Sequence, residues 1–186
     1  MKIFFSEPAQ SPNYFLTKAV RENKLTYACI GYAFGIISLY FAIKLGTQNT
    51  ASLTSFLFAF IIWFLSNIVL NFVLAALCNL LLEMTDNKTS ALGIFILLGL
   101  SQLIWSLLVP CFIFARAFTP LMPWTALFVL AIFAAQIYFV LNSIKQIYGI
   151  SKASSLFAFI FAFILPFAAA FCFVVFIVGV LISLLA

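Results

Sequence analysis

Long apolar runs recur along the chain, and they constrain its fold more than any other feature of the sequence. Wound as a helix, a run of about 20 residues crosses the roughly 30 Å hydrocarbon core of a bilayer. Charged residues make up only 7% of the 186 positions, whereas soluble domains carry roughly 25%. We therefore expect an all-α integral membrane protein.

The breaks between the runs predict a bundle of five transmembrane helices. The expected spans are 25–43, 55–82, 91–115, 121–141 and 155–186, with the fourth ending near Asn142 and Lys145. The segment EMTDNKTS separates the second and third spans, because its charges cannot lie in lipid. Residues 1–24 are expected to form a cytoplasmic N-terminal tail, and residues 25–186 a single membrane domain. No cleavable signal peptide is expected, because the first apolar run begins only near Leu25.

Basic residues are distributed unequally between the two ends of these spans. The N-terminal side has seven of them, namely Lys2, Lys18, Arg21, Lys24, Lys88, Lys145 and Lys152. The opposite side has only Lys44 and Arg116. Because cytoplasmic segments carry an excess of Lys and Arg, we expect the N-terminus inside and the C-terminus outside. The expected location is a bacterial cytoplasmic membrane.

The sequence lacks the residue types that most catalytic sites require. The chain has no histidine, which removes Ser-His and Cys-His pairs and HExxH zinc sites. The carboxylates all lie in expected tails or loops, so none is available for a proton relay within the membrane: Glu7, Glu22, Glu83 and Asp86. We therefore expect a non-enzymatic protein that has no cofactor, no metal and no nucleic-acid partner.

Uncharged polar residues remain inside the expected spans. Asn67 and Asn71 are four positions apart in the second span, Gln102 lies in the third and Gln136 in the fourth. One interpretation is that these amides hydrogen-bond across helices and fix the bundle, at about 0.6 to 2 kcal/mol each. The other is that they line a neutral cavity for a small molecule or a lipid head group. In both cases we expect Asn67, Asn71 and Gln102 to point into the bundle, because an amide facing lipid would be unpaired.

Small residues and prolines predict local features of the spans. Gly31 and Gly35 form a GxxxG step, which permits close helix approach either within the bundle or in a homo-oligomer. Pro110 and Pro166 lie inside the third and fifth spans, where each removes a backbone donor and favours a kink.

The N-terminal tail contains a candidate helix. In SPNYFLTKAVRENK, Ser11 is the expected N-cap and Pro12 the first helical residue. Its apolar side would consist of Phe15, Leu16, Ala19 and Val20. The segment is either a short amphipathic helix on the cytoplasmic membrane face or a frayed polar lead-in to the first span.

The expected cytoplasmic loops carry Lys88, Lys145 and Lys152. These lysines form a candidate contact face for a protein partner or for anionic lipid, which attracts each nearby basic residue by about 1 kcal/mol. The alternative is that the charges only set the topology and solvate the loops.

Three segments resemble the Ypt-interacting-protein (Yip) domain family in its bacterial form. SPNYFLTKAVRENK is similar to the family's lead-in to its first helix, and LLGLSQLIWSLLVP to its third helix. IKQIYGISKASSLFAF is similar to the loop into the fifth helix, with matching spacing at Tyr148, Gly149, Ser151, Lys152 and Ala153. The resemblance implies five spans and a polytopic helper protein, not a catalyst. Eukaryotic members bind Rab-type GTPases through an acidic DL-x-GP-type segment that this chain lacks, so a Rab partner is not expected.

Together these features indicate a non-enzymatic membrane protein that acts through protein partners or membrane lipids. The alternative is a transport component, such as a substrate-binding membrane subunit. In that case the neutral cavity would be lined by Asn67, Asn71, Gln102 and Gln136.

Overall fold

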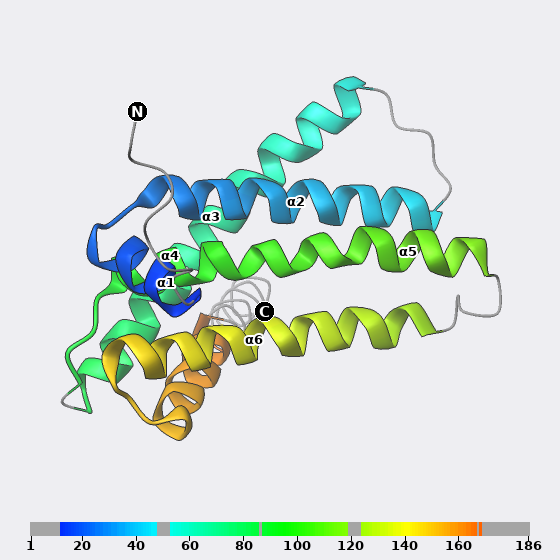
Figure 1. Ribbon diagram of the computed structural model, residues 1–186. Coiled ribbons are helices and arrows are strands. Elements are labelled where there is room, and N and C mark those ends of the chain that lie inside the picture. The colour runs from blue at the N-terminus through cyan, green and yellow to red at the C-terminus, as the bar shows by residue number, and fades with distance from the viewer. Residues whose placement is uncertain (1–11, 48–52, 86, 119–123, 167, 169–186) are drawn as a thin grey trace, which may run out of the picture.

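The computed structural model describes residues 12–47, 53–85, 87–118, 124–166 and 168, and the described chain is helical (Figure 1). The elements in order are α1 (Pro12–Arg21), α2 (Leu25–Thr47), α3 (Leu53–Glu83), α4 (Ala91–Ser101), η1 (Gln102–Leu107), α5 (Leu108–Ala117) and α6 (Thr125–Tyr148). A further apolar helix, Lys152–Pro166, follows α6. The prediction of an all-α fold is confirmed.

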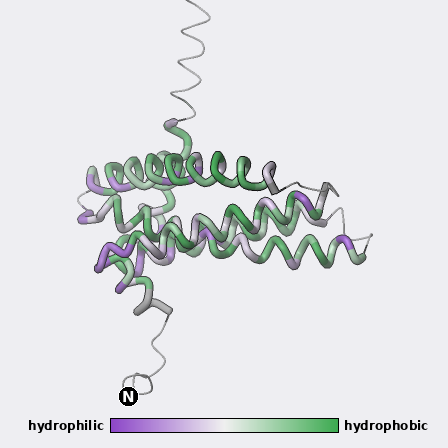
Figure 2. The backbone as a smooth tube through the Cα atoms, turned by 90° about the horizontal axis from the view of Figure 1, so that it is seen from above, coloured by the Kyte–Doolittle hydropathy of each residue, from purple (hydrophilic) through white to green (hydrophobic). Residues whose placement is uncertain are grey.

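Within the described residues, four helical stretches are long and apolar enough to cross a membrane. They are Leu25–Gly46, Thr54–Glu83, Ala91–Ala117 and Thr125–Tyr148. Hydrophobic residues cover most of their length in Figure 2, and hydrophilic residues gather toward the helix ends. The fifth predicted span is not confirmed: the helix Lys152–Pro166 is shorter, and residues 167 and 169–186 lie outside the described part of the chain.

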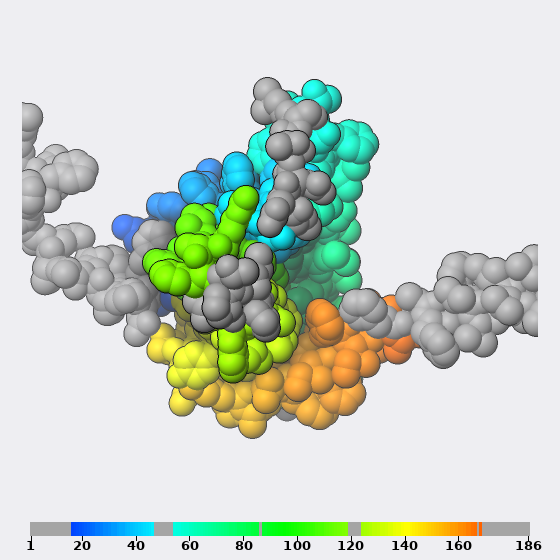
Figure 3. Space-filling view, turned by 90° about the vertical axis from the view of Figure 1, so that its right-hand side faces the viewer, coloured from blue at the N-terminus to red at the C-terminus, as the bar shows by residue number. Residues whose placement is uncertain are grey.

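The bundle is built around α4. Every residue of α4 from Gly93 to Ser101 is buried, and α1, α2, α3 and α6 all pack against this helix. The helix α2, the α4–η1–α5 stretch and α6 lie side by side in Figure 1. The N-terminal end of α3 leans away from them, and in Figure 3 it protrudes from the upper part of the molecule. The core is therefore concentrated around the first half of the third span.

Small residues bring the backbones of α2 and α4 into contact. A Cβ atom added to Gly31 would lie 2.1 Å from the carbonyl oxygen of Gly99, and one added to Gly99 would lie 2.7 Å from the Cα of Ala28. The GxxxG step thus serves packing within the chain. A homo-oligomer through Gly31 and Gly35 stays a prediction, and this glycine face is covered by the protein's own third span.

The third span changes helix type in its middle, where a kink at Pro110 was predicted. The 3₁₀ segment η1 separates α4 from α5, and Pro110 lies in the first turn of α5. Proline lacks an N–H, and its ring crowds the carbonyl four residues earlier, here that of Ser106. Regular α-helical hydrogen bonding is therefore disfavoured in the turn that precedes Pro110. The span ends at Ala117, two residues beyond its predicted end.

The end of the fourth predicted span and the start of the fifth also differ from the prediction. The helix α6 continues past Asn142 and Lys145 to Tyr148, where Gly149 follows with a φ of 71° and donates its N–H to the carbonyl of Lys145 at 2.9 Å. The error arose because polar residues mark where a helix leaves the hydrocarbon, not where its backbone bonding stops. Lys145 therefore lies in the last turn of α6, a favourable position for a cation. The next helix begins at Lys152 rather than near Ser155.

The tail segment forms α1, which begins at Pro12. Its Leu16, Ala19 and Val20 are buried in the same core cluster as α4, and α1 packs against both α4 and α6. The protein itself, rather than lipid, therefore covers this apolar side. The expected N-cap Ser11 lies outside the described residues, as does the side chain of Phe15.

We predict that Gly99→Ala will lower the free energy of unfolding by about 1 to 3 kcal/mol, because its new methyl group would overlap the backbone of α2. Gly46→Ala is the control, since the nearest neighbour of that Cβ is a side-chain carbon of Phe112 at 3.0 Å. Reversible unfolding in mixed micelles measures both. Equal stability of the two variants would contradict the close α2–α4 contact.

Candidate functional site

Amides from α3 and η1 bind each other inside the bundle. Asn67 Nδ2 donates to Gln102 Oε1 at 3.3 Å, and Gln102 Nε2 donates back to Asn67 Oδ1 at 3.4 Å. Asn71, one turn further along α3, donates through Nδ2 to the backbone oxygen of Asn67 at 2.8 Å and also to its Oδ1. The bonds between Asn67 and Gln102 join α3 to η1, while those of Asn71 lie within α3, and together they give the amides partners that lipid cannot supply.

Gln136 of α6 joins the third span through separate hydrogen bonds. Its Oε1 accepts from Trp105 Nε1 at 2.6 Å, and its Nε2 donates to Ser101 Oγ at 3.1 Å. Ser101 Oγ donates in turn to the carbonyl of Leu98 at 2.6 Å. Trp105 and Ser101 were not predicted as partners of Gln136. Their four-residue spacing, which places both on one side of the span, was the available signal.

Gly35 of α2 makes the space that Gln102 occupies. A Cβ atom at Gly35 would lie 2.8 Å from Gln102 Oε1 and 2.9 Å from its Cβ. Gln102 is only 9% exposed, so its side chain has little freedom to move aside. The second glycine of the GxxxG step therefore positions the amide that pairs with Asn67.

Asn71, Gln102, Trp105 and Gln136 contribute to the wall of one cavity of about 140 Å³. Its remaining wall is apolar and includes Phe133 of α6 and Phe159 and Phe163 of the helix Lys152–Pro166. Asn67 is not one of the described wall residues, but it holds both Asn71 and Gln102. Three of the four amides singled out from the sequence thus meet at this cavity.

The chemistry of the cavity is that of a neutral hydrogen-bonding site. None of the described wall residues is ionisable. Carboxamides supply N–H donors and carbonyl acceptors, and the indole supplies one further donor. An engineered cavity of about 150 Å³ is known to bind benzene, so this space accommodates a single small ring or a group of similar size. The arrangement can bind and orient an uncharged polar group.

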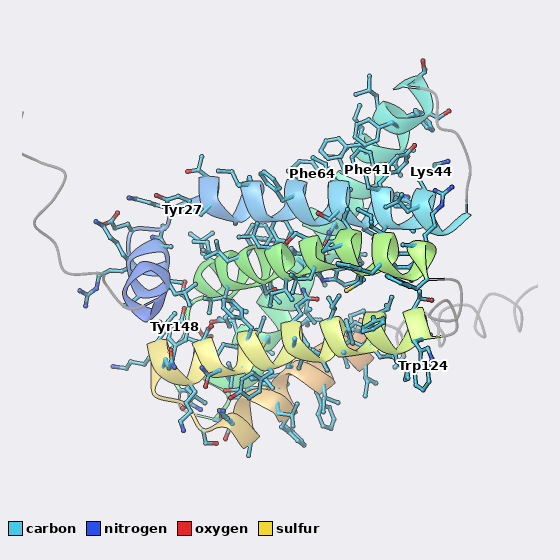
Figure 4. The ribbon with its side chains drawn as sticks, turned by 45° about the vertical axis from the view of Figure 1, so that its right-hand side comes forward. Tyr27, Phe41, Lys44, Phe64, Trp124 and Tyr148 are labelled. Carbon is cyan, nitrogen blue, oxygen red and sulfur yellow. The ribbon has the colours of Figure 1, made fainter. Side chains whose placement is uncertain are left out.

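The two ends of the bundle differ in charge. Tyr27 and Tyr148 mark one end in Figure 4, and Lys44 and Trp124 mark the other. Of the described basic residues, the first end has six, on α1, on the connections beside it and on the helices that begin or finish there: Lys18, Arg21, Lys24, Lys88, Lys145 and Lys152. The second end has Lys44 and Arg116. The fold therefore places at one end the described basic residues that were predicted to lie on the cytoplasmic side.

The lysines of the predicted contact face are all exposed at this end: Lys88, Lys145 and Lys152. Lys152 Nζ lies 4.6 Å from the centre of the Tyr138 ring and 3.4 Å from its hydroxyl oxygen. Nearby, Lys24 pairs with Glu22 at 2.6 Å, and this hydrogen bond lowers the pKa of Glu22 and raises that of Lys24. Exposed pairs of this kind contribute little stability. A contact face here stays a prediction.

No protein-family model, curated protein or solved structure matches the chain. The resemblance to the Yip domain family consequently stays a prediction without independent support. The fold itself defines the class: an all-helical integral membrane protein in which four described helices can cross a bilayer.

We predict an energetic coupling between Asn67 and Gln102. Asn67→Leu leaves the Gln102 amide without this partner, and Gln102→Leu leaves Asn67 Nδ2 without its acceptor, at a cost of about 1 to 3 kcal/mol each. The double variant should cost less than the sum of the two, by about 0.6 to 1.7 kcal/mol, which is the range found for hydrogen bonds between membrane helices.

The control cycle combines Gln102→Leu with Asn79→Leu. Asn79 is also on α3, but its partners are Glu83 and Thr89. This pair should be additive within about 0.5 kcal/mol. Additivity of the Asn67 and Gln102 changes in the same unfolding assay would show that the amide pair is not formed.

Proposed function

We propose that this chain is a non-enzymatic integral membrane protein that binds an uncharged molecule, or the uncharged part of a lipid, within its helical bundle. The observation that carries the proposal is the convergence of Asn71, Gln102 and Gln136 on one cavity, each from a different element. This convergence favours a substrate-binding membrane subunit or transport component over action through a protein partner alone.

The cavity itself argues for a ligand. If the amides served only to fix the bundle, they could pair in a filled interior, and protein interiors have few voids larger than a water molecule. Side chains of α3, η1 and α6 instead border a space of about 140 Å³ that is partly open to its surroundings. A ligand of matching size would add van der Waals contacts with this wall.

The positions of the reactive groups support a binding role rather than catalysis. The described carboxylates Glu22 and Glu83 lie at the ends of helices, away from the cavity wall. Cys78 is buried in the core of α3 and is not among the described wall residues. The wall offers hydrogen bonds and apolar contacts, which bind a ligand without activating it.

We predict that a panel of uncharged compounds will contain at least one that raises the melting temperature of the purified protein. A ligand at 100 times its Kd contributes about 2.7 kcal/mol. Asn71→Leu should remove the effect, because it replaces a polar part of the wall with a side chain of similar size. Its described hydrogen bonds are all within α3, so the bundle should still form.

Asn79→Leu is the matched control, since it removes an amide from the same helix outside the cavity. It should leave the stabilisation intact. Loss of stabilisation in both variants would place the ligand elsewhere, and a panel without any stabilising compound would contradict the proposal.

The unequal charge of the two ends supports a cytoplasmic location for the end that carries α1 and Lys88. The bacterial cytoplasmic membrane stays a prediction. We predict that a cysteine at Asn87, in a chain whose native cysteines are replaced, will react with an impermeant reagent only after the inner face is opened. A cysteine at Lys44 should react in intact cells. Labelling of position 87 in intact cells would reverse the orientation.

A further inference from the structure

We infer that the ligand is a lipophilic, uncharged molecule that reaches the cavity sideways from the bilayer, between Phe133 of α6 and Phe163 of the helix Lys152–Pro166. The inference rests on the proposed function and adds to it the class of ligand and its path. Three observations carry it: the depth of the cavity, the thin wall at the two phenylalanines, and the composition of the rest of the wall.

The cavity lies near the middle of the membrane. Gln136 is close to the midpoint of α6 (Thr125–Tyr148), so each end of the helix is about 16 to 18 Å away at 1.5 Å per residue. Through Leu98 the cavity borders the tightly packed interior around α4, whose residues from Gly93 to Ser101 are all buried. A path from either aqueous face is therefore long.

The lateral wall is thin by comparison. Phe133 and Phe163 both line the cavity, yet they are 42% and 49% exposed. Each ring therefore has one side toward the cavity and an exposed part away from it. Rotation of these two side chains would widen a path between the cavity and the bilayer.

The rest of the wall selects the chemical class. Apolar side chains line the cavity beside the amides, including Leu74, Leu98 and Val140, each about one helical turn from an amide. A solute with several hydroxyl groups would give up hydration water at groups that find no hydrogen-bond partner in the cavity, at a cost of about 1 to 3 kcal/mol per group. Desolvation of an unpaired ion would cost more. An apolar ring or chain with one polar group matches the wall.

The polar group is expected to be a hydrogen-bond acceptor. Gln102 Nε2 donates to Asn67, and Gln136 Nε2 donates to Ser101. Each carboxamide nitrogen has two hydrogens, so each of these groups keeps a second N–H for another acceptor. A carbonyl or hydroxyl oxygen of the ligand fits this role.

Trp105 provides a reporter, because its Nε1 donates to Gln136 and it lines the cavity. Trp63→Phe and Trp124→Phe would leave it as the sole tryptophan in protein reconstituted into phosphatidylcholine vesicles. The probes are three brominated quenchers: lipophilic, uncharged 4-bromophenol, charged 4-bromobenzenesulfonate and water-soluble, uncharged 3-bromo-1,2-propanediol. We expect saturable quenching by 4-bromophenol alone, and we expect Leu74→Phe, which fills the cavity, to abolish the saturable part.

The path is tested by the rate constant for the onset of Trp105 quenching after 4-bromophenol is added. Phe133→Ala should accelerate it several-fold, whereas Phe128→Ala should not. Phe128 is a matched control, since it lies on the same helix and is 41% exposed but is not among the described wall residues. Equal rates in the two variants would overturn the lateral path.

The remaining outcomes separate the ligand class from the proposed function. Saturable quenching by 3-bromo-1,2-propanediol or by the sulfonate, but not by 4-bromophenol, would overturn the lipophilic class and leave the binding function standing. If none of the probes quenches saturably and no compound stabilises the protein, both the ligand class and the proposed function are overturned, and the cavity holds only water.

Discussion

The backbone contact between α2 and α4 at Gly31 and Gly99 determines how the rest of the bundle is arranged. In a bilayer no hydrophobic force draws apolar helices together, because lipid chains are as apolar as leucine, and association depends on close packing and on interhelical hydrogen bonds. The two glycines supply the packing. They fix α2 so that Gly35, one turn further along, faces Gln102 and leaves the space in which that side chain lies.

The second constraint is that polar groups within a membrane must find partners inside the protein. Asn67 and Gln102 bind each other, while Gln136 binds Trp105 and Ser101. Both sets of bonds involve the third span, which is consistent with its central position. Between them lies a space of about 140 Å³ that these bonds do not fill.

The sequence predicts the helical class and the amides because both follow from local rules. An apolar run has one stable conformation in lipid, and an amide in the middle of such a run has no alternative to the bundle interior. The sequence also indicates Pro110 as a point of irregularity. It does not predict the end of α6 at Tyr148, because a helix that has left the hydrocarbon continues until its backbone bonding stops, here at Gly149.

The partners of the amides were harder to predict, because they depend on which helices become neighbours. Gln136 bonds to residues 31 and 35 positions away in the sequence, and only the folded bundle brings these together. The sequence offered a cavity lined by these amides as one of two interpretations. Its volume could not be predicted, since it is the difference between the space among several helices and the side chains that fill it. Phe159 and Phe163 line it from a helix that carries none of the four amides.

A crystal structure of the protein grown from a lipidic mesophase would test the binding cavity most directly. We expect electron density larger than water in the cavity, within hydrogen-bonding distance of Gln102 or Gln136 and extending between Phe133 and Phe163 toward the bilayer. A cavity that is closed by the surrounding side chains, or one that contains only ordered water, would contradict a ligand-binding role.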